Sequence, residues 1–170
     1  MDNNTILKFD FFKPFRIFLA YLVPLVVIVV FVTALVLNWQ MNKYRTGEVV
    51  IDDRIAVDVM VADTPEKRQK GLTVKDSLGG REGMLFEFPH ADRYRFWMKD
   101  MAFPIDIIWL IDEEIVDFSL NIPPADPSLK VIPGYQPAVP INKVLEVPAG
   151  FVAEQGLRLG MTVSYRIDTK

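Results

Sequence analysis

Residues 83–111 read GMLFEFPHADRYRFWMKDMAFPIDIIWLI, and this stretch decides the fold of the chain. It contains two of the three tryptophans and three of the seven methionines, and its apolar runs are broken by Pro and Asp. Apolar runs rich in aromatic and β-branched residues, separated by tight connections, are typical of β-strands. We therefore predict strands over 83–88, 94–100 and 106–111.

Charged side chains are embedded in and beside this apolar stretch. They are Arg81, Arg95, Lys99, Asp100 and Asp106. Because burying an unpaired charge is costly, these side chains are expected either to pair with one another or to line a pocket.

The strand pattern continues on both sides of the central stretch. After the Asp52-Asp53 pair, the β-branched residues of 55–61 alternate with Ala56, Asp58 and Met60, which predicts a strand with one buried face in a hairpin. Thr64-Pro65-Glu66 predicts the start of a short helix, and a second short helix is expected over 149–155. Further strands are expected at IVDFSLN (115–121), VLEV (144–147) and TVSYRID (162–168). The fold class is therefore mainly β, a compact barrel or sandwich with two short helices.

Residues 122–142 contain six of the twelve prolines in the chain. Such a density of proline excludes a regular helix or a central strand. Because strand patterns flank the segment, it is interpreted as a long, stiff surface loop beside the sheet, where a groove could form.

The N-terminal part of the chain carries a different signal. Residues 17–37 are 21 residues without a formal charge, and as a helix they extend roughly 31 Å, which matches the hydrocarbon core of a bilayer. Aromatic residues flank the run at Tyr21, Trp39 and Tyr44, as at membrane interfaces. We expect a single transmembrane helix over 17–37.

The distribution of Lys and Arg indicates an orientation for this helix. Three basic residues precede the apolar run and two follow it, which favours a cytoplasmic N-terminal segment, residues 1–16, and an extracytoplasmic domain. Residues 38–47 would be a juxtamembrane linker, and residues 48–168 the β domain outside the cell membrane. The alternative is a cleavable signal peptide with a cleavage site at 32–34, although the apolar run continues past that site to Leu37.

Charge also divides the chain and bears on its partners. Residues 47–170 contain 14 basic and 20 acidic residues, a net charge of −6, whereas residues 1–46 contain 5 and 2, a net charge of +3. An acidic domain is a poor partner for nucleic acid. We therefore expect no nucleic-acid partner. The expected partners are the membrane, through the single span, and an envelope ligand or protein.

No catalytic or metal-binding pattern accompanies the fold. The chain has no Cys, so thiolate chemistry, disulfides and Cys-based metal sites are excluded. His90 is the only histidine, and no G-x-S-x-G motif supplies a nucleophile for it to activate. We predict no metal and no cofactor, and the chain is more consistent with a non-enzymatic protein.

Several motifs, in their order and spacing, resemble the family called domain of unknown function 192, across about residues 48–168. They are Gly71-Leu72, Leu78, GMLF (83–86), FWMK (96–99), PIDI (104–107), VLE (144–146) and PAG (148–150). The resemblance implies a compact β-rich domain that is often exported or membrane-tethered in prokaryotes. The family has no established activity, so the resemblance implies no catalytic residue.

This chain departs from the pattern of that family at three positions. Lys75 stands where Arg is usual, Asp100 where Asn is usual, and Met161 where Asp is often found. Many relatives also have cysteines in the proline-rich loop, and none is present here.

The candidate site lies around Trp97, Lys99 and Asp106. If strands 94–100 and 106–111 pair, Asp106 lies near Lys99, and Trp97 shares a strand face with Arg95 and Lys99. This group is either a structural ion pair under a tryptophan or a shallow pocket whose lysine binds an anion.

Two further residues could contribute to such a site. Glu146 lies within the apolar run VLEV, where it could line the pocket or pair with Arg81 or Arg95, and we expect it to face solvent. Tyr135 in the proline-rich loop would be a natural ligand contact.

Three functions follow from these observations. The first is a non-enzymatic binding or interaction module, anchored in the membrane and exposed in the cell envelope. The second is a hydrolase of an envelope polymer that uses Asp106 with Glu146 or Asp100 as a carboxylate pair. The third is a structural subunit of a membrane complex.

Overall fold

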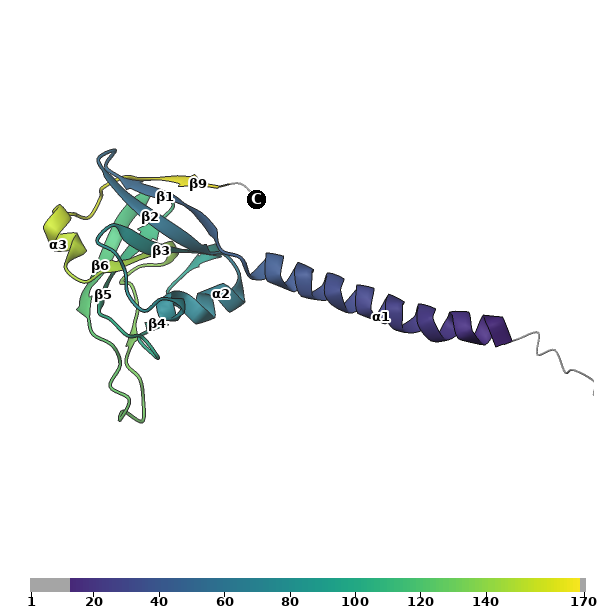
Figure 1. Ribbon diagram of the computed structural model, residues 1–170. Helices are drawn as coiled ribbons and strands as arrows, with labels where there is room; N and C mark the ends of the chain where they lie inside the picture. Colours follow the sequence, from purple (N-terminus) through teal and green to yellow (C-terminus); the bar gives the residue numbers. More distant parts are fainter. Residues whose placement is uncertain (1–12, 169–170) are drawn as a thin grey trace, which may run out of the picture. The chain divides into compact units, whose positions relative to one another are not determined.

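The structure is a computed structural model that describes residues 13–168 (Figure 1). The chain divides into two units, one ending at Lys43 and the other beginning at Tyr44. Of the expected cytoplasmic segment, residues 1–12 lie outside the described residues.

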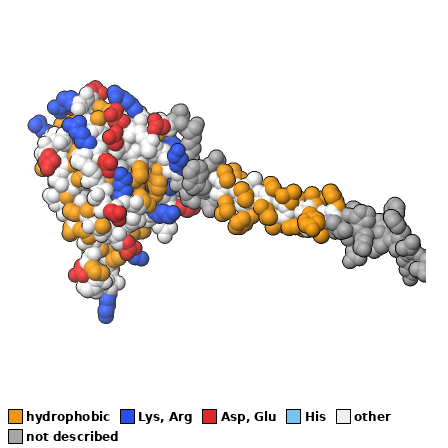
Figure 2. Space-filling view, in the orientation of Figure 1, with side chains coloured by type: hydrophobic (Ala, Val, Ile, Leu, Met, Phe, Trp, Pro, Cys, Tyr) orange, Lys and Arg blue, Asp and Glu red, His pale blue; other side chains and the backbone are white. Residues whose placement is uncertain are grey.

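The first unit is the helix α1 (Lys13–Asn42). Its segment Ala20–Leu37 is long and apolar enough to span a membrane, and none of that segment is buried. Hydrophobic side chains cover the described part of the helix (Figure 2). The helix is longer than predicted, and strand β1 begins at Arg45, so most of the expected linker 38–47 belongs to helix or strand.

The second unit is built on a seven-stranded sheet, which confirms the mainly β class. Its strands are β1 (Arg45–Ile51), β2 (Ile55–Ala62), β3 (Glu82–Asp92), β5 (Ile105–Ile111), β6 (Glu114–Ile122), β8 (Ile141–Pro148) and β9 (Val163–Ile167). The spatial order is β6-β5-β8-β3-β2-β1-β9. All neighbours are antiparallel except β2 and β3, which are parallel.

The parallel pair requires a crossover, and two short helices provide it. Helix α2 (Pro65–Lys70) starts after Thr64, whose hydroxyl accepts a hydrogen bond from the backbone N–H of Lys67 at 3.3 Å. The 3-10 helix η1 (Gly71–Val74) follows directly. With α3 (Phe151–Gln155), the two short α-helices expected in the domain are present.

A second, two-stranded sheet corrects one prediction. Strand β4 covers only Phe96–Trp97, and it pairs with β7 (Gly134–Tyr135) inside the proline-rich segment. The pairing of 94–100 with 106–111, on which the proximity of Lys99 and Asp106 depended, therefore does not occur. The reason is that β5 already has β6 on one edge and β8 on the other, so it has no free edge for a third strand.

The two faces of the large sheet carry separate hydrophobic cores, because successive residues of a strand point to opposite faces. The first core contains residues from all seven strands and from α3, including Val57, Leu145 and Val163. The second core lies on the opposite face of β3, β5 and β8, and there η1, β4 and the proline-rich segment cover it. Both faces of the central strands are thus buried.

The sheet is not closed into a barrel, and the fold is sandwich-like. Its edge strands β6 and β9 meet at one end only, through an isolated bridge between Glu114 and Thr162. Near this bridge the N–H of Val163 donates to the carbonyl of Glu113 at 2.7 Å.

Candidate functional site

A pocket of about 310 Å³ lies over the face of the sheet that carries the second core. Helix α2 and η1 form one side, β4 and its flanking residues form the other, and strands β3 and β8 lie beneath. We call it the aromatic pocket. Basic, aromatic, aliphatic and acidic side chains line it, among them Arg68, Lys70, Leu72, Phe86, Phe88, Arg95, Phe96, Trp97, Lys99 and Glu146.

Aromatic rings form much of the pocket wall. Phe86 and Phe88 are two residues apart on β3 and therefore share a face of the sheet. Phe96 on β4 meets the ring of Phe86 edge-on, with a distance of 5.0 Å between ring centroids, and Phe88 stacks on Tyr94 at 3.7 Å. Such mutual packing fixes the rings in place.

Glu146 lies at the bottom of the pocket. Its neighbours across the adjacent strands are Met84 on β3 and Ile107 on β5, both buried and apolar. The residue is only 6% exposed, and among the residues that the structure describes no hydrogen-bond or ion-pair partner contacts its carboxyl group. Burial alone raises the pKa of Glu146 to about 8. The prediction that Glu146 faces solvent is wrong, because both faces of β8 are covered.

Basic side chains surround the opening of the pocket. They are Arg68, Lys70, Arg95 and Lys99, and the last three are exposed. Within residues 13–168 none of the four forms an ion pair with a carboxylate. We call these four residues the basic rim.

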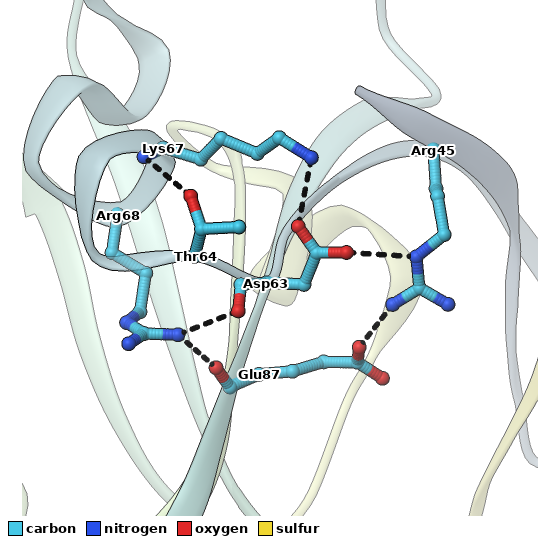
Figure 3. A network of polar contacts seen from close by, with 6 residues as sticks. All are labelled: Arg45, Asp63, Thr64, Lys67, Arg68 and Glu87. Atoms are coloured by element: carbon cyan, nitrogen blue, oxygen red, sulfur yellow. Dashed lines mark hydrogen bonds and ion pairs between the residues drawn. The ribbon is translucent and has the colours of Figure 1, made fainter. Parts of the chain in front are cut away.

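A network of charged residues holds α2 against the sheet, as Figure 3 shows. The carboxylate of Asp63, which follows β2, accepts from Lys67 Nζ at 2.8 Å and from Arg45 Nε at 2.9 Å. Arg45 also donates to Glu87 at 2.6 Å and so links β1 to β3. Burial opposes ionisation of Asp63, but the hydrogen bonds from Lys67 and Arg45 outweigh it and lower the pKa of this carboxyl group.

Arg68 connects this network to the aromatic pocket. Its guanidinium donates to the backbone carbonyls of Asp63 and Glu87, at 3.1 and 2.8 Å (Figure 3), and lies 5.0 Å from the centre of the Phe88 ring. These contacts hold its charge beside the pocket without neutralising it.

The structure brings together four of the six residues predicted for the site. Trp97, Lys99, Arg95 and Glu146 all line the aromatic pocket, and Trp97 remains 51% exposed. Tyr135 is elsewhere. It lines a smaller hollow of about 200 Å³ with Met98 and several residues of the proline-rich segment.

Asp106 is the sixth candidate, and its position is structural. It is 1% exposed, and its two carboxylate oxygens accept hydrogen bonds from the N–H groups of Asn121, at 2.7 Å, and Val152, at 3.0 Å. The second bond caps the start of α3, where Gly150 has no side chain to do so.

Asp106 and Glu146 lie on opposite faces of the sheet. Asp106 is opposite Val147 in the register of β5 and β8, whereas Glu146 is opposite Ile107. Val147 belongs to the first core and Ile107 to the second. The two carboxyl groups therefore do not form a pair around one substrate, and no ion pair joins Asp106 to Lys99 among the described residues.

Asp100, the other residue considered for a carboxylate pair, does not line the aromatic pocket. It is exposed in the turn after Lys99 and has a φ of 59°, a left-handed conformation that Asn and Asp adopt more readily than other residues with side chains. An Asp in place of the Asn usual in the resembled family is compatible with this turn.

His90 is exposed on β3 and does not line the aromatic pocket. Within the described part of the chain no three His, Asp or Glu residues lie close enough together to hold a metal ion. The expectation of no metal and no cofactor stays a prediction.

Sequence reasoning missed one side of the pocket. Arg68 and Lys70 were recognisable as basic residues at the end of a predicted helix, and Phe86 and Phe88 as core residues. Nothing in the sequence indicated that the crossover between β2 and β3 places α2 opposite β4. That juxtaposition depends on a parallel strand pair, which leaves no local signal.

The fold and the pocket define a mainly β domain of sandwich type with a concave aromatic site. Residues 48–165 match the DUF192 family, described as "Uncharacterized ACR", and the chain belongs to this family. No curated protein matches the chain.

Two solved structures share the fold. One is a protein of unknown function from Novosphingobium aromaticivorans DSM 12444, with 28% identity and a TM-score of 0.61, covering 71% of this chain and 83% of that one. The other comes from Sinorhizobium meliloti 1021 and is named as a candidate transcription regulator. It has 24% identity and a TM-score of 0.60, and the match covers 72% of this chain and 94% of that chain. At this identity the second likeness shows the fold alone.

Proposed function

We propose that this protein is a non-enzymatic binding module of the cell envelope, anchored by α1, whose ligand occupies the aromatic pocket. The observation that carries the proposal is the carboxyl group of Glu146, which borders the bottom of an open pocket, is largely buried and has no hydrogen-bond or ion-pair partner among the described residues. A buried polar group without a hydrogen bond costs stability, so such a group in a pocket is accounted for if a ligand supplies its partner.

The geometry supports binding better than hydrolysis. A carboxylate pair for glycoside cleavage needs two carboxyl groups about 5–9 Å apart around one bond. Asp106 is engaged by two backbone N–H groups on the other face of the sheet, and among the described residues Glu146 is the only acidic one that lines the aromatic pocket.

The membrane anchor is the second element of the proposal. Its support is the apolar segment Ala20–Leu37 of α1 and the excess of basic residues before it, which favours a cytoplasmic N-terminus and a domain outside the cell membrane. The alternative is removal of this segment as a signal peptide.

Carbonate extraction and intact mass test the anchor. We expect the full-length mass to remain in the carbonate-washed membrane fraction, and protease added to spheroplasts to digest the domain. A mature protein that has lost α1, or a domain protected from protease in intact spheroplasts, would contradict this part of the proposal.

Thermal shift of the full chain in nanodiscs tests the binding function. We expect at least one compound in a panel of envelope glycans, peptides and polar lipid fragments to raise the melting temperature. The shift should be lost in Lys99→Glu, which reverses a charge on the basic rim, and kept in Lys130→Glu, which makes the same change at an exposed lysine outside the pocket. A panel without any shift, or a shift that both variants keep, would contradict a ligand site in this pocket.

A further inference from the structure

We propose that the ligand of the aromatic pocket is a small zwitterion that directs an amine to Glu146 and a phosphate or carboxylate to the basic rim. This inference rests on the proposed binding function and names the chemistry of its ligand. The shared chemistry is a primary or quaternary amine a few bonds from an anionic group, whether free in solution or as a lipid headgroup.

The first support is the separation of charge types by depth. Glu146 at the bottom is 6% exposed, whereas Lys70, Arg95 and Lys99 are exposed at the opening. A ligand that enters amine first therefore meets an acid inside and cations outside. Its two ends match both parts of the site.

The second support is the chemistry of the wall. The rings of Phe86 and Phe96 line the pocket together with Glu146, whereas the ring of Phe88 is already stacked on Tyr94 and contacted by Arg68. Aromatic faces attract ammonium groups, most strongly where water is excluded, and a carboxylate adds a charge-assisted hydrogen bond for a primary amine. An amine at this position would also give the unpartnered carboxyl group its missing partner.

Simpler ligands fit only half of the site. A cation without an anionic group must pass the four basic residues of the rim and leaves them unpaired. An anion without an amine satisfies the rim but leaves Glu146 buried without a partner. A zwitterion pairs with both the basic rim and Glu146. The site therefore discriminates against a ligand that carries only the cation or only the anion.

The volume of the pocket limits the size of the ligand. At about 310 Å³ it lies near the lower end of the range for small-molecule sites, roughly 300–1,000 Å³. A headgroup-sized molecule such as phosphoethanolamine or phosphocholine fits this range, whereas an oligosaccharide could insert only one end.

Proton release provides a readout that is specific to the amine. Because burial raises the pKa of Glu146 to about 8, the free site holds a proton near neutral pH. An ammonium group beside the carboxyl group favours its ionised form, so binding of a zwitterion releases that proton to the buffer. An anion that binds only at the rim leaves the proton on Glu146 in place.

Titration calorimetry of the full chain in phosphatidylglycerol nanodiscs tests the proposal with three probes near neutral pH. The probes are phosphoethanolamine, ethanolamine as the cationic half, and ethyl phosphate as the anionic half. We expect phosphoethanolamine to bind at least about tenfold more tightly than either half. Measured in two buffers with different heats of ionisation, its binding should release close to one proton.

Variants separate the two ends of the ligand. Glu146→Gln should abolish proton release and reduce the preference for phosphoethanolamine over ethyl phosphate to near unity, while ethyl phosphate binding is kept. Lys99→Glu should weaken phosphoethanolamine and ethyl phosphate alike, and Lys130→Glu should change neither. Circular dichroism checks that each variant is folded, and Lys99→Glu tests the rim even where Glu146→Gln does not fold.

A second set of nanodiscs distinguishes the sources of the ligand. If a headgroup occupies the pocket, adding phosphatidylethanolamine weakens the apparent affinity for free phosphoethanolamine, because the tethered headgroup competes. If the ligand is a soluble amine, the affinity does not change. Either result agrees with a zwitterion site.

Other outcomes would overturn the inference. Ethyl phosphate binding as tightly as phosphoethanolamine, or phosphoethanolamine binding without proton release, would show an anion site and leave the binding function standing. Absence of binding by phosphoethanolamine, with shifts from other compounds in the wider panel, would also reject the zwitterion alone. Absence of any binding in both experiments would reject the binding function itself.

Discussion

Strands β5 and β8 carry two buried carboxyl groups, one on each face of the sheet, and the two differ in their hydrogen-bond partners. Asp106, on the face of the first core, accepts two backbone N–H groups within hydrogen-bond distance. Glu146, on the face of the second core, has no such partner among the described residues and borders an open pocket. The strands, the burial and the chemical group are nearly the same, so the difference lies in what surrounds each carboxyl group.

The difference separates a structural role from a binding role. Asp106 joins β5 to the N-terminus of α3 and to Asn121, whose φ of 51° places it in the left-handed region. These two hydrogen bonds stabilise the fold. The fold gains nothing comparable from Glu146, and burial without a partner opposes its ionisation.

The largest expected effect of a substitution on this comparison is that of Asp106→Ala. Removing the carboxylate leaves two N–H groups without acceptors inside the protein, and we expect a loss of about 3 kcal/mol in the free energy of unfolding. Chemical denaturation of the full chain, followed by circular dichroism of the domain, measures this loss.

Glu146→Gln is the matched control for that experiment, since it alters the other carboxyl group on the neighbouring strand. It should leave the free energy of unfolding near neutral pH unchanged or higher, because a neutral amide, unlike the carboxylate of the unfolded chain, does not have to take up a proton on folding. If both variants were destabilised equally, Glu146 would be as structural as Asp106, and the contrast between the two faces would be lost.

The comparison also predicts a pH dependence of stability. The pKa of Glu146 is raised in the folded state, from 4.5 to about 8, so between these values the folded protein holds more protons than the unfolded chain. The free energy of unfolding contributed by this group is therefore greatest below pH 4.5 and falls as the pH rises toward about 8, by at most about 1.4 kcal/mol per pH unit.

Denaturation curves across that pH window measure the slope. Glu146→Gln should reduce the slope, and Lys130→Glu, a substitution of an exposed residue outside the pocket, should leave the slope unchanged. Equal slopes in wild type and Glu146→Gln would mean that the carboxyl group is ionised in the folded protein, and the pocket would then be polar at its bottom.

The parts of the fold that depend on local pattern were predictable from sequence. The hairpin between β1 and β2 follows from the two runs that Asp52-Asp53 interrupts, and both of these residues have positive φ in the structure. Helix α2 follows from Thr64 and Pro65 at its start. The membership in DUF192 also followed from motif spacing, since the matched residues 48–165 agree with the resemblance.

The orientation of Glu146 and the pairing of β4 were not predictable, for a physical reason. Alternation identifies an outward face only where one face of a strand meets water. Both faces of β8 are covered, so a carboxyl group among apolar neighbours carried no sign of which face it used. The partner of β4 was hidden as well, because Gly134–Tyr135 is a two-residue strand among prolines.

Gly134→Ala is expected to have the smallest effect on stability and to sharpen the distinction between the fold and the basic rim. A methyl group at Gly134 would lie 1.8 Å from Nε of Arg95, which is the end of a flexible, exposed side chain and can move aside. The free energy of unfolding should change by less than about 0.5 kcal/mol, while the displaced guanidinium weakens binding of phosphoethanolamine about threefold.

Gly83→Ala is the matched contrast, because its methyl group would lie 2.6 Å from the backbone carbonyl of Glu146, which cannot move without shifting β8. Denaturation and calorimetry on both variants decide the matter: a Gly134→Ala protein as unstable as Gly83→Ala would make Arg95 part of the scaffold rather than part of the binding surface.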